Sequence, residues 1–348
     1  MPEPERVLVV APNWLGDAVM ALPALADIRR ASSQARLIVA ARPSVAPLYS
    51  MVPAVDATMV MQWGGLVRDR RRLQEDVQQM LAEGVERAIL FPNSFASAWA
   101  VHRARVPDRW GYAADLRRPL LTRAVRRPRG SRHQGAYYQH LVRELGMPTG
   151  ALEPVLTIPG SAVEEARALL RMRGWEESRP TLVVAPGAVY GTAKRWLPRH
   201  FAALISRAIR ETGVHVVLVG APADAESARL VLDSTGVAER GAIVNLTGAT
   251  TLQTLAGVMS LAAACVSNDS GAMHLAGAVG TPLAALFGPT REKETAPLTR
   301  HGGRSEVLIN HIWCRPCMLR ECPFDHQCMT GLKPERVFES VRVLMGTQ

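Results

Sequence analysis

Long apolar runs are absent from this sequence: none approaches the roughly 20 consecutive apolar residues that a membrane-spanning helix needs. The first six residues, Met1–Arg6, lack the basic-then-apolar order of a signal peptide, so we expect a cytoplasmic protein. Aromatic residues are scarce at 5%, and only five cysteines occur among 348 residues. These deficits exclude an integral membrane protein and a small disulfide scaffold.

Lysine is also scarce, since only Lys194, Lys293 and Lys333 contribute to the 41 basic residues and all the others are arginine. The net charge of +10 suits nucleic acid, anionic lipid or phosphorylated substrates and does not choose among them. Ten arginines lie between His102 and His133, against two aspartates. Because no stacking motif or recognition helix accompanies them, we expect no nucleic-acid partner.

Short apolar runs alternate with helical patterns along most of the chain, which predicts an α/β fold with mostly parallel sheets. Between residues 103 and 135 the pattern dissolves into Arg, Pro and Gly, and we expect loops there. The predicted strands include 6–11, 37–41, 87–91, 181–185, 214–219, 264–267 and 282–287, and the predicted helices include 15–31, 66–83, 134–145, 161–173, 198–212 and 270–279.

The domain boundary is expected near residues 147–159, which hold three prolines and a glycine. At 348 residues, and with 48% apolar residues, the chain suits two domains. We therefore expect Rossmann-like domains over residues 1–158 and 159–348. The last helix, near 334–345, could pack back on the N-terminal domain.

A Gly-Asp pair follows the first predicted strand, in the segment 11–17 (APNWLGD). No G-x-G-x-x-G occurs there, so the dinucleotide fingerprint is missing. A strand-to-helix turn faces the ligand crevice of an open α/β sheet, where the carboxylate of Asp17 could act as a general base. Asp17 also suits the dipole at a helix N-terminus, and both interpretations stay open at this point.

Two cations follow a glycine-containing turn in the second half, where Lys194 and Arg195 come shortly after Gly187. Cations behind such a turn suit a phosphate or diphosphate. In a chain that uses arginine almost everywhere, Lys194 indicates a need for a compact ammonium group. A solvated basic turn explains the same residues.

The segment 267–274 (SNDSGAMH) joins a short apolar strand to an apolar helix. Backbone amides of Ser270 and Gly271 at the helix N-terminus would bind phosphate oxygens, with Asp269 and His274 beside the same crevice. A simple N-cap explains Asp269 or Ser270 but not the whole string. His274 alone is equally consistent with a structural core histidine.

Four thiols fall within 15 residues, as Cys314, Cys317, Cys322 and Cys328. Such a group can hold zinc or an iron–sulfur cluster, although its spacing matches no standard zinc ribbon. A cytoplasmic setting disfavours stable disulfides. We therefore expect reduced thiols rather than a metal site, and expect Cys265 to lie in the core.

Together these motifs resemble those of the bacterial ADP-heptose:lipopolysaccharide heptosyltransferases. The resemblance covers nearly the whole chain and is strongest to the heptosyltransferase II branch, through N-W-x-G-D, A-K-R-W, S-N-D-S-G and the Cys-rich tail. It implies a GT-B fold, with the acceptor on the N-terminal domain and the nucleotide sugar on the C-terminal one. The motifs that carry it are Asn13–Asp17, Pro186–Trp196, Ser267–His274 and Phe287–Thr290.

The resemblance implies inverting transfer of L-glycero-D-manno-heptose from ADP-heptose to the first heptose of the lipopolysaccharide inner core, with no metal and no other cofactor. Asp17 matches the catalytic base of the family, and Lys194 matches its diphosphate-binding lysine. For the adenosine ribose, Asp224 and Glu226 are alternatives. The further donor-binding residues implied are Gly187, Thr192, Asp269, Ser270, Gly271, His274 and Glu226, and those proposed for the acceptor are Asn13, Arg103, Arg109 and Arg132.

The implied partners are ADP-heptose, the acceptor heptosyl-Kdo2-lipid A, and the anionic inner face of the inner membrane, which the arginines of 102–133 would contact peripherally. We expect a monomer. The alternative is heptosyltransferase I, or another GT-B enzyme that uses a different nucleotide sugar. The sequence indicates neither the acceptor hydroxyl nor the contacts to adenine.

Overall fold

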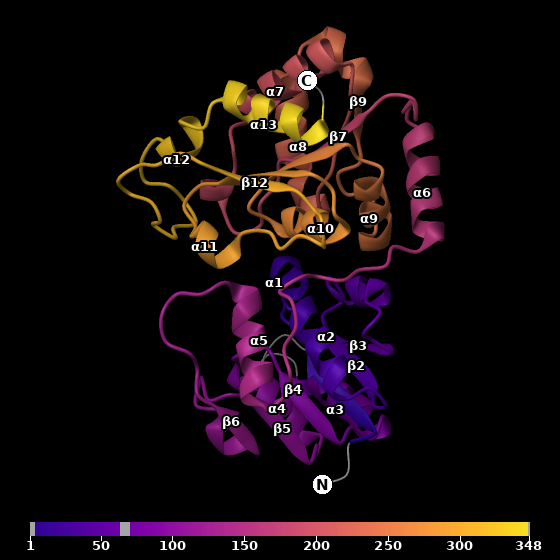
Figure 1. Cartoon of the computed structure of the whole chain (residues 1–348), viewed down its shortest axis with the longest axis vertical. Helices are drawn as coiled ribbons and strands as arrows, with labels where there is room; N and C mark the ends of the chain where they lie inside the picture. Colours follow the sequence, from indigo (N-terminus) through magenta and orange to yellow (C-terminus); the bar gives the residue numbers. More distant parts are fainter. Residues whose placement is uncertain (1–3, 63–69, 347–348) are drawn as a thin grey trace. The chain divides into compact units, whose positions relative to one another are not determined.

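The computed structural model describes residues 4–62 and 70–346. Contacts between Cα atoms divide the chain into two compact units, Met1–Thr157 and Ile158–Gln348. Each unit is built on a six-stranded sheet with helices packed on it (Figure 1), and the strand pairings are parallel throughout. Within the described residues, none of the helices has the length and apolar character needed to cross a membrane.

The sheet of the N-terminal unit has the strand order β3-β2-β1-β4-β5-β6. Its central strand β1 is buried apart from Arg6, as expected for a parallel strand covered on both faces. The strands are β1 Arg6–Val10, β2 Arg36–Ala41, β3 Ala57–Val60, β4 Arg87–Leu90, β5 Asp108–Tyr112 and β6 Arg123–Val125. The helices are α1 Leu15–Met20, α2 Leu22–Ala31, α3 Arg70–Ala82, α4 Phe95–Arg103 and α5 Gln134–Glu144, with 3-10 turns at Ala46–Met51 and Arg118–Leu120.

Two expectations for this unit need correction. The predicted helix 15–31 is broken at Ala21 into α1 and α2, because Pro23 has no N–H to donate one turn back. The segment 103–135 is not all loop, since it contains β5 and β6 at one edge of the sheet. These edge strands are short and partly exposed, so they lack the apolar run that identifies a buried strand. Residues 66–69 of the predicted helix 66–83 lie outside the described residues.

The sheet of the C-terminal unit repeats the same topology, in the order β12-β11-β10-β7-β8-β9. In both sheets the order in which successive strands are added changes side once. This reversal point lies between β1 and β4 in the first sheet and between β7 and β10 in the second. The strands are β7 Thr181–Ala185, β8 His215–Leu218, β9 Ile243–Asn245, β10 Ala264–Asn268, β11 Leu283–Phe287 and β12 Ser305–Ile309. The helices are α6 Gly160–Arg171, α7 Pro198–Thr212, α8 Ala225–Ser234, α9 Leu252–Ser260, α10 Gly271–Val279, α11 Glu292–Thr295, α12 Gln327–Thr330 and α13 Pro334–Met345, with 3-10 turns at Thr192–Lys194, Pro222–Asp224 and Val237–Ala242.

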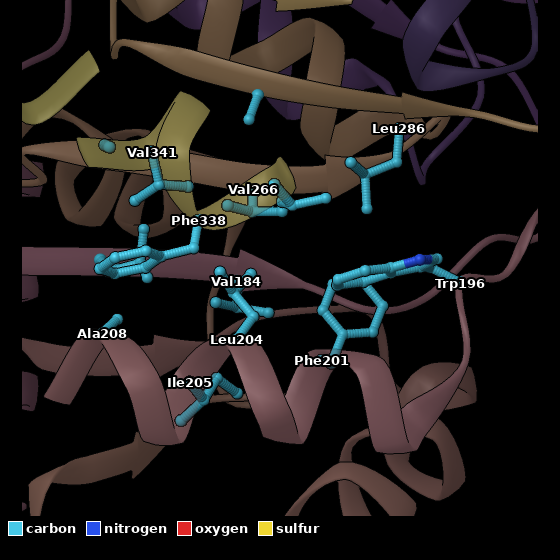
Figure 2. Packing of buried hydrophobic residues seen from close by; sticks show 14 of the residues in the cluster. Val184, Trp196, Phe201, Leu204, Ile205, Ala208, Val266, Leu286, Phe338 and Val341 are labelled. Atoms are coloured by element: carbon cyan, nitrogen blue, oxygen red, sulfur yellow. The ribbon is translucent and has the colours of Figure 1, made fainter. Parts of the chain in front are cut away.

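One face of this sheet is covered by α7 and α13, whose apolar side chains meet those of the strands. Figure 2 shows Leu204 of α7 pointing toward Val184 and Phe201 of α7 next to Trp196; Phe338 of α13 belongs to the same cluster. The last helix α13 therefore packs on α7 and on β10, β11 and β12 of its own unit. Packing of this helix back on the N-terminal domain stays a prediction.

Candidate functional site

The predicted site residues follow strands that flank the reversal point of each sheet. Ligands of open α/β sheets bind outside the carboxyl ends of the strands at this point, because the loops there diverge and leave a crevice. In the N-terminal unit, Asp17 follows β1. In the C-terminal unit, Lys194 follows β7 and Asp269 follows β10. The topology thus places each predicted group at the edge where a ligand can bind.

Asp17 lies half-buried in the first turn of α1, next to helix α5. Burial, and in second place the charge of Asp17, raise the pKa of the Tyr138 hydroxyl on α5 well above its ordinary value. Tyr138 therefore stays protonated beside the carboxylate. The hydroxyl of Tyr49 is also buried, has no hydrogen-bond partner among the described residues, and has a pKa raised by burial. Asn13 is exposed just before α1.

The three arginines predicted to bind the acceptor do not lie together. Arg132 lies in the loop between β6 and α5, at the carboxyl edge, and its Nε is buried without a hydrogen-bond partner in the described chain. Arg103 ends α4, and because the helix of a βαβ unit runs antiparallel to its strands, it lies toward their amino ends. Arg109 lies near the start of β5 and donates to the carbonyls of Leu120 and Pro107 at 2.7 and 3.2 Å. Of the three, Arg132 alone follows the carboxyl end of a strand.

Lys194, Asp269 and Thr290 form a polar cluster at the carboxyl edge of the second sheet. The Nζ of Lys194 lies 2.6 Å from Oδ2 of Asp269, and the Thr290 hydroxyl donates to the same oxygen at 2.6 Å. Only 12% of the Lys194 side chain and 4% of the Asp269 side chain are exposed. The ammonium also lies 4.7 Å from the ring centroid of Tyr190. A charged pair with this little exposure is not a solvated basic turn.

Trp196 holds the turn that carries Lys194. Its ring is 1% exposed and its indole N–H donates to the carbonyl of Leu332 at 2.8 Å. Its backbone N–H donates to Oδ1 of Asn268 at 3.0 Å, and Nδ2 of Asn268 donates to the carbonyl of Pro186 at 2.8 Å. Asn268 therefore ties the loop after β7 to the end of β10, which keeps Lys194 beside Asp269.

The N-terminus of α10 has no side-chain cap among the described residues. Ser270 is its N-cap residue but makes no side-chain cap bond within the described residues, because its hydroxyl lies 3.1 Å from the hydroxyl of Ser267. Ser270 therefore occupies the N-cap position without capping the helix through its side chain. The first amides of α10, beginning at Gly271, retain donors for an anionic ligand. His274 is only 3% exposed, on the buried side of the helix.

Gly187 is required by the close approach of a carboxylate. A Cβ built on Gly187 would lie 2.1 Å from Oδ1 of Asp224, so no side chain fits. Asp224 is 7% exposed and accepts a hydrogen bond from the Ala221 amide at 2.9 Å. Glu226 is exposed in the first turn of α8. The structure thus gives Asp224 an internal role and leaves Glu226 available to solvent.

Two cavities adjoin the cluster. One of about 530 Å³ is lined by Thr192 and by Ser227 and Leu230 of α8. A second of about 70 Å³ is lined by the four clustered cysteines, which the structure holds as free thiols. Within residues 4–62 and 70–346, no three histidine, cysteine, aspartate or glutamate side chains are arranged to hold a metal ion.

Sequence reasoning missed several contributors to these sites. Thr290 lies three residues after the end of β11 and so reaches the carboxyl edge, a position from which its role could have been predicted. Tyr190 and Tyr138 gave no signal, because tyrosines are common in ordinary cores. Their proximity to Lys194 and Asp17 depends on the fold.

Known proteins match nearly the whole chain. Residues 72–327 match the model of glycosyltransferase family 9 (heptosyltransferase). The chain is 30% identical to lipopolysaccharide heptosyltransferase 2 of Salmonella typhimurium, over 99% of both chains, and 30% identical to that of Escherichia coli, over 98% of both. It superposes on the structure of the E. coli ADP-heptose LPS heptosyltransferase II with a TM-score of 0.84, at 26% identity over 98% of each chain. The predicted GT-B fold, with two Rossmann-like domains and parallel sheets, is confirmed.

Proposed function

Because the chain belongs to glycosyltransferase family 9, the heptosyltransferases, we propose that it moves L-glycero-D-manno-heptose from ADP-heptose to the first heptose of the lipopolysaccharide inner core. This is the reaction of heptosyltransferase II. The observation that carries the proposal is the Lys194–Asp269 pair beside the N-terminus of α10, which no side chain of the described residues caps. An ammonium and unpaired amides at one sheet edge suit the diphosphate of a nucleotide sugar.

In the proposed reaction, a hydroxyl of the acceptor heptose attacks the anomeric carbon on the side opposite ADP. A new C–O bond forms, the bond to the β-phosphate oxygen breaks, and the anomeric configuration inverts. Asp17 accepts the proton of the attacking hydroxyl, a contribution of about 10²–10⁴-fold. Tyr138 stays neutral beside Asp17, so it adds no second charge to the base.

The leaving ADP gains negative charge on its terminal phosphate as the bond breaks. Lys194 and the amides of Ser270 and Gly271 would stabilise that charge, in the role that a divalent ion has in other transferases, so we propose that the reaction does not depend on metal. Asp269 would accept hydrogen bonds from sugar hydroxyls. His274, Thr192 and Gly187 remain donor-site proposals, and the exposed Glu226 is the better candidate for the ribose.

On the acceptor side we propose Asn13 and Arg132, which lie at the carboxyl edge with Asp17. The arginines of 126–129 are exposed in the loop that follows β6, at the same edge. They suit the phosphates and Kdo carboxylates of the inner core, or anionic lipid at about 1 kcal/mol per residue. We therefore propose peripheral binding to the inner face of the inner membrane. Arg109, whose guanidinium is bound to backbone carbonyls, is a poor acceptor ligand.

A transfer assay in EDTA tests the proposal, with ADP-heptose as donor and with acceptors that carry either one heptose or none. We expect product only on the acceptor that already carries one heptose. Transfer only to the heptose-free acceptor would indicate heptosyltransferase I. Turnover of another nucleotide sugar in place of ADP-heptose would indicate a different GT-B enzyme, and loss of activity in EDTA would contradict metal independence.

A further inference from the structure

The segment between β12 and α12, residues 310–326, packs against both loops of the proposed donor site. It has no helix or strand of its own. The cavity lined by three thiols of this segment and by Cys328 of α12 is also lined by Ala193, next to Lys194, and by Pro289, next to Thr290. The residues next to Lys194 and Thr290 thus line the same cavity as this segment.

Hydrogen bonds to backbone carbonyls connect the segment to both loops. The Met318 amide donates to the carbonyl of Pro289 at 3.0 Å, and the Tyr190 hydroxyl donates to the carbonyl of Met318 at 2.8 Å. The Ala193 amide donates to the carbonyl of Arg320 at 3.0 Å. These contacts bring the segment to the donor loops but do not by themselves orient Thr290.

Arg315 makes the contacts that orient this turn. Its Nε donates to the carbonyl of Gly288 at 2.6 Å, and its Nη2 donates to the carbonyl of Thr290 at 3.1 Å and to Oε2 of Glu292 at 2.9 Å. Only 7% of the side chain is exposed. The two carbonyls follow the last residue of β11, Phe287, and so lie beyond the strand, where they need donors from elsewhere. One planar guanidinium therefore fixes the backbone on both sides of Pro289.

A continuous series of contacts leads from Arg315 to Lys194. Arg315 holds the Thr290 carbonyl, the Thr290 hydroxyl donates to Asp269, and the same Asp269 oxygen binds Lys194. Each of these groups is largely buried, so solvent cannot easily replace a lost partner.

We propose that Arg315 is a positioning residue of the donor site, which holds Thr290 against Asp269 and thereby sets the place of the Lys194 ammonium. The proposal deepens the proposed function and rests on it for the identity of the ligand. A lysine at position 315 could keep the ion pair with Glu292 but could not bind two carbonyls in a fixed fork. The effect of Arg315 should therefore depend on guanidinium geometry and not on charge alone.

The first test needs no ligand, because the chain has only three lysines. Site-resolved mass spectrometry after brief acetylation gives the labelling ratio of Lys194 to the exposed Lys333. In Arg315→Met we expect this ratio to rise roughly fivefold, equivalent to about 1 kcal/mol of lost pairing energy. In Arg315→Lys we expect an intermediate rise.

The matched control is Arg291→Met, which removes an exposed ion pair to Glu294 near the same turn. Its labelling ratio should equal that of the wild type. An unchanged ratio in Arg315→Met, or an equal rise in Arg291→Met, would overturn the proposal. Thermal unfolding is measured for each variant. If Arg315→Met does not fold, the labelling ratio of Arg315→Lys decides: a ratio above that of the wild type supports the proposal, and a wild-type ratio overturns it.

The second test is calorimetric titration with ADP. We expect the Kd to rise about fivefold in Arg315→Met and less in Arg315→Lys, in the order of the labelling ratios. A raised labelling ratio with unchanged ADP affinity would refute the role of Lys194 in the proposed function, and would leave its positioning by Arg315 supported. The two failures are thereby distinguishable.

Discussion

Replacing Lys194 by methionine would remove the ammonium but keep most of the volume of the side chain. Asp269 would then be left as a charge with 4% side-chain exposure and, among the described residues, with the Thr290 hydroxyl as its remaining side-chain donor. Breaking a buried ion pair on one side costs about 3–5 kcal/mol. Since 12% of the Lys194 side chain is exposed and Thr290 remains, we expect the lower end, about 3 kcal/mol. For a unit of this size that lowers Tm by about 6–12 °C.

The double variant Lys194→Met/Asp269→Asn tests the origin of this loss. It removes both charges, so most of the stability should return and the double-mutant cycle should give a large coupling energy. ADP affinity should not return, because loss of a charged hydrogen bond to phosphate costs about 1.5–3 kcal/mol, or roughly 10–150-fold in Kd.

Thermal unfolding and ADP titration of the wild type, both single variants and the double variant complete the experiment. The reasoning is refuted if Lys194→Met unfolds at the wild-type temperature, or if the double variant binds ADP as tightly as the wild type.

Three further predictions concern other residues. Asp17→Asn should lower kcat by about 10²–10⁴-fold and leave the Kd of ADP unchanged, whereas wild-type turnover would contradict its role as base. Burial opposes ionisation of Glu292, but its own amide and Arg315 hold the pKa of its carboxyl below the usual 4.5. The contribution of Glu292 to stability should therefore be present above pH 4.5 and be lost as the pH falls through the folded pKa. The difference in unfolding free energy between wild type and Glu292→Gln should shrink in acid. A difference that grows in acid would contradict this prediction. Gly187→Ala should destabilise by about 1–3 kcal/mol in urea unfolding, because the new methyl group would overlap the Asp224 carboxylate, and wild-type stability would show that the carboxylate moves aside freely.

The central part of each sheet could be predicted from the sequence. Strands such as β1, β7 and β11 are covered on both faces, so their residues form nearly continuous apolar runs that stand out from the helices between them. Edge strands carry no such signal. The strands β5 and β6 are recognisable only through the neighbours with which they pair, since half-exposed arginines fill their outer positions.

The candidate site divides in the same way. Asp17, Lys194 and the segment 267–274 could be proposed from the sequence, because a strand followed by a polar turn predicts the carboxyl edge of a parallel sheet. The sequence did not show where the arginines of 102–133 lie, because their order in the chain does not say which end of the sheet each one reaches. Arg109 turned out to bind carbonyls near the start of β5, whereas Arg132 lies after β6.

By itself, then, the sequence determined the α/β class, the family resemblance and the strand ends that carry charged groups, since these depend on local patterns of polarity. Only the tertiary structure decided which of those groups meet. Lys194, Asp269, Thr290 and Arg315 come from four separate loops, and their contacts exist because parallel pairing brings the ends of β7, β10 and β11 to one edge. Local sequence carries no information on that registration, because it is set by hydrogen bonds between strands that lie far apart in the chain.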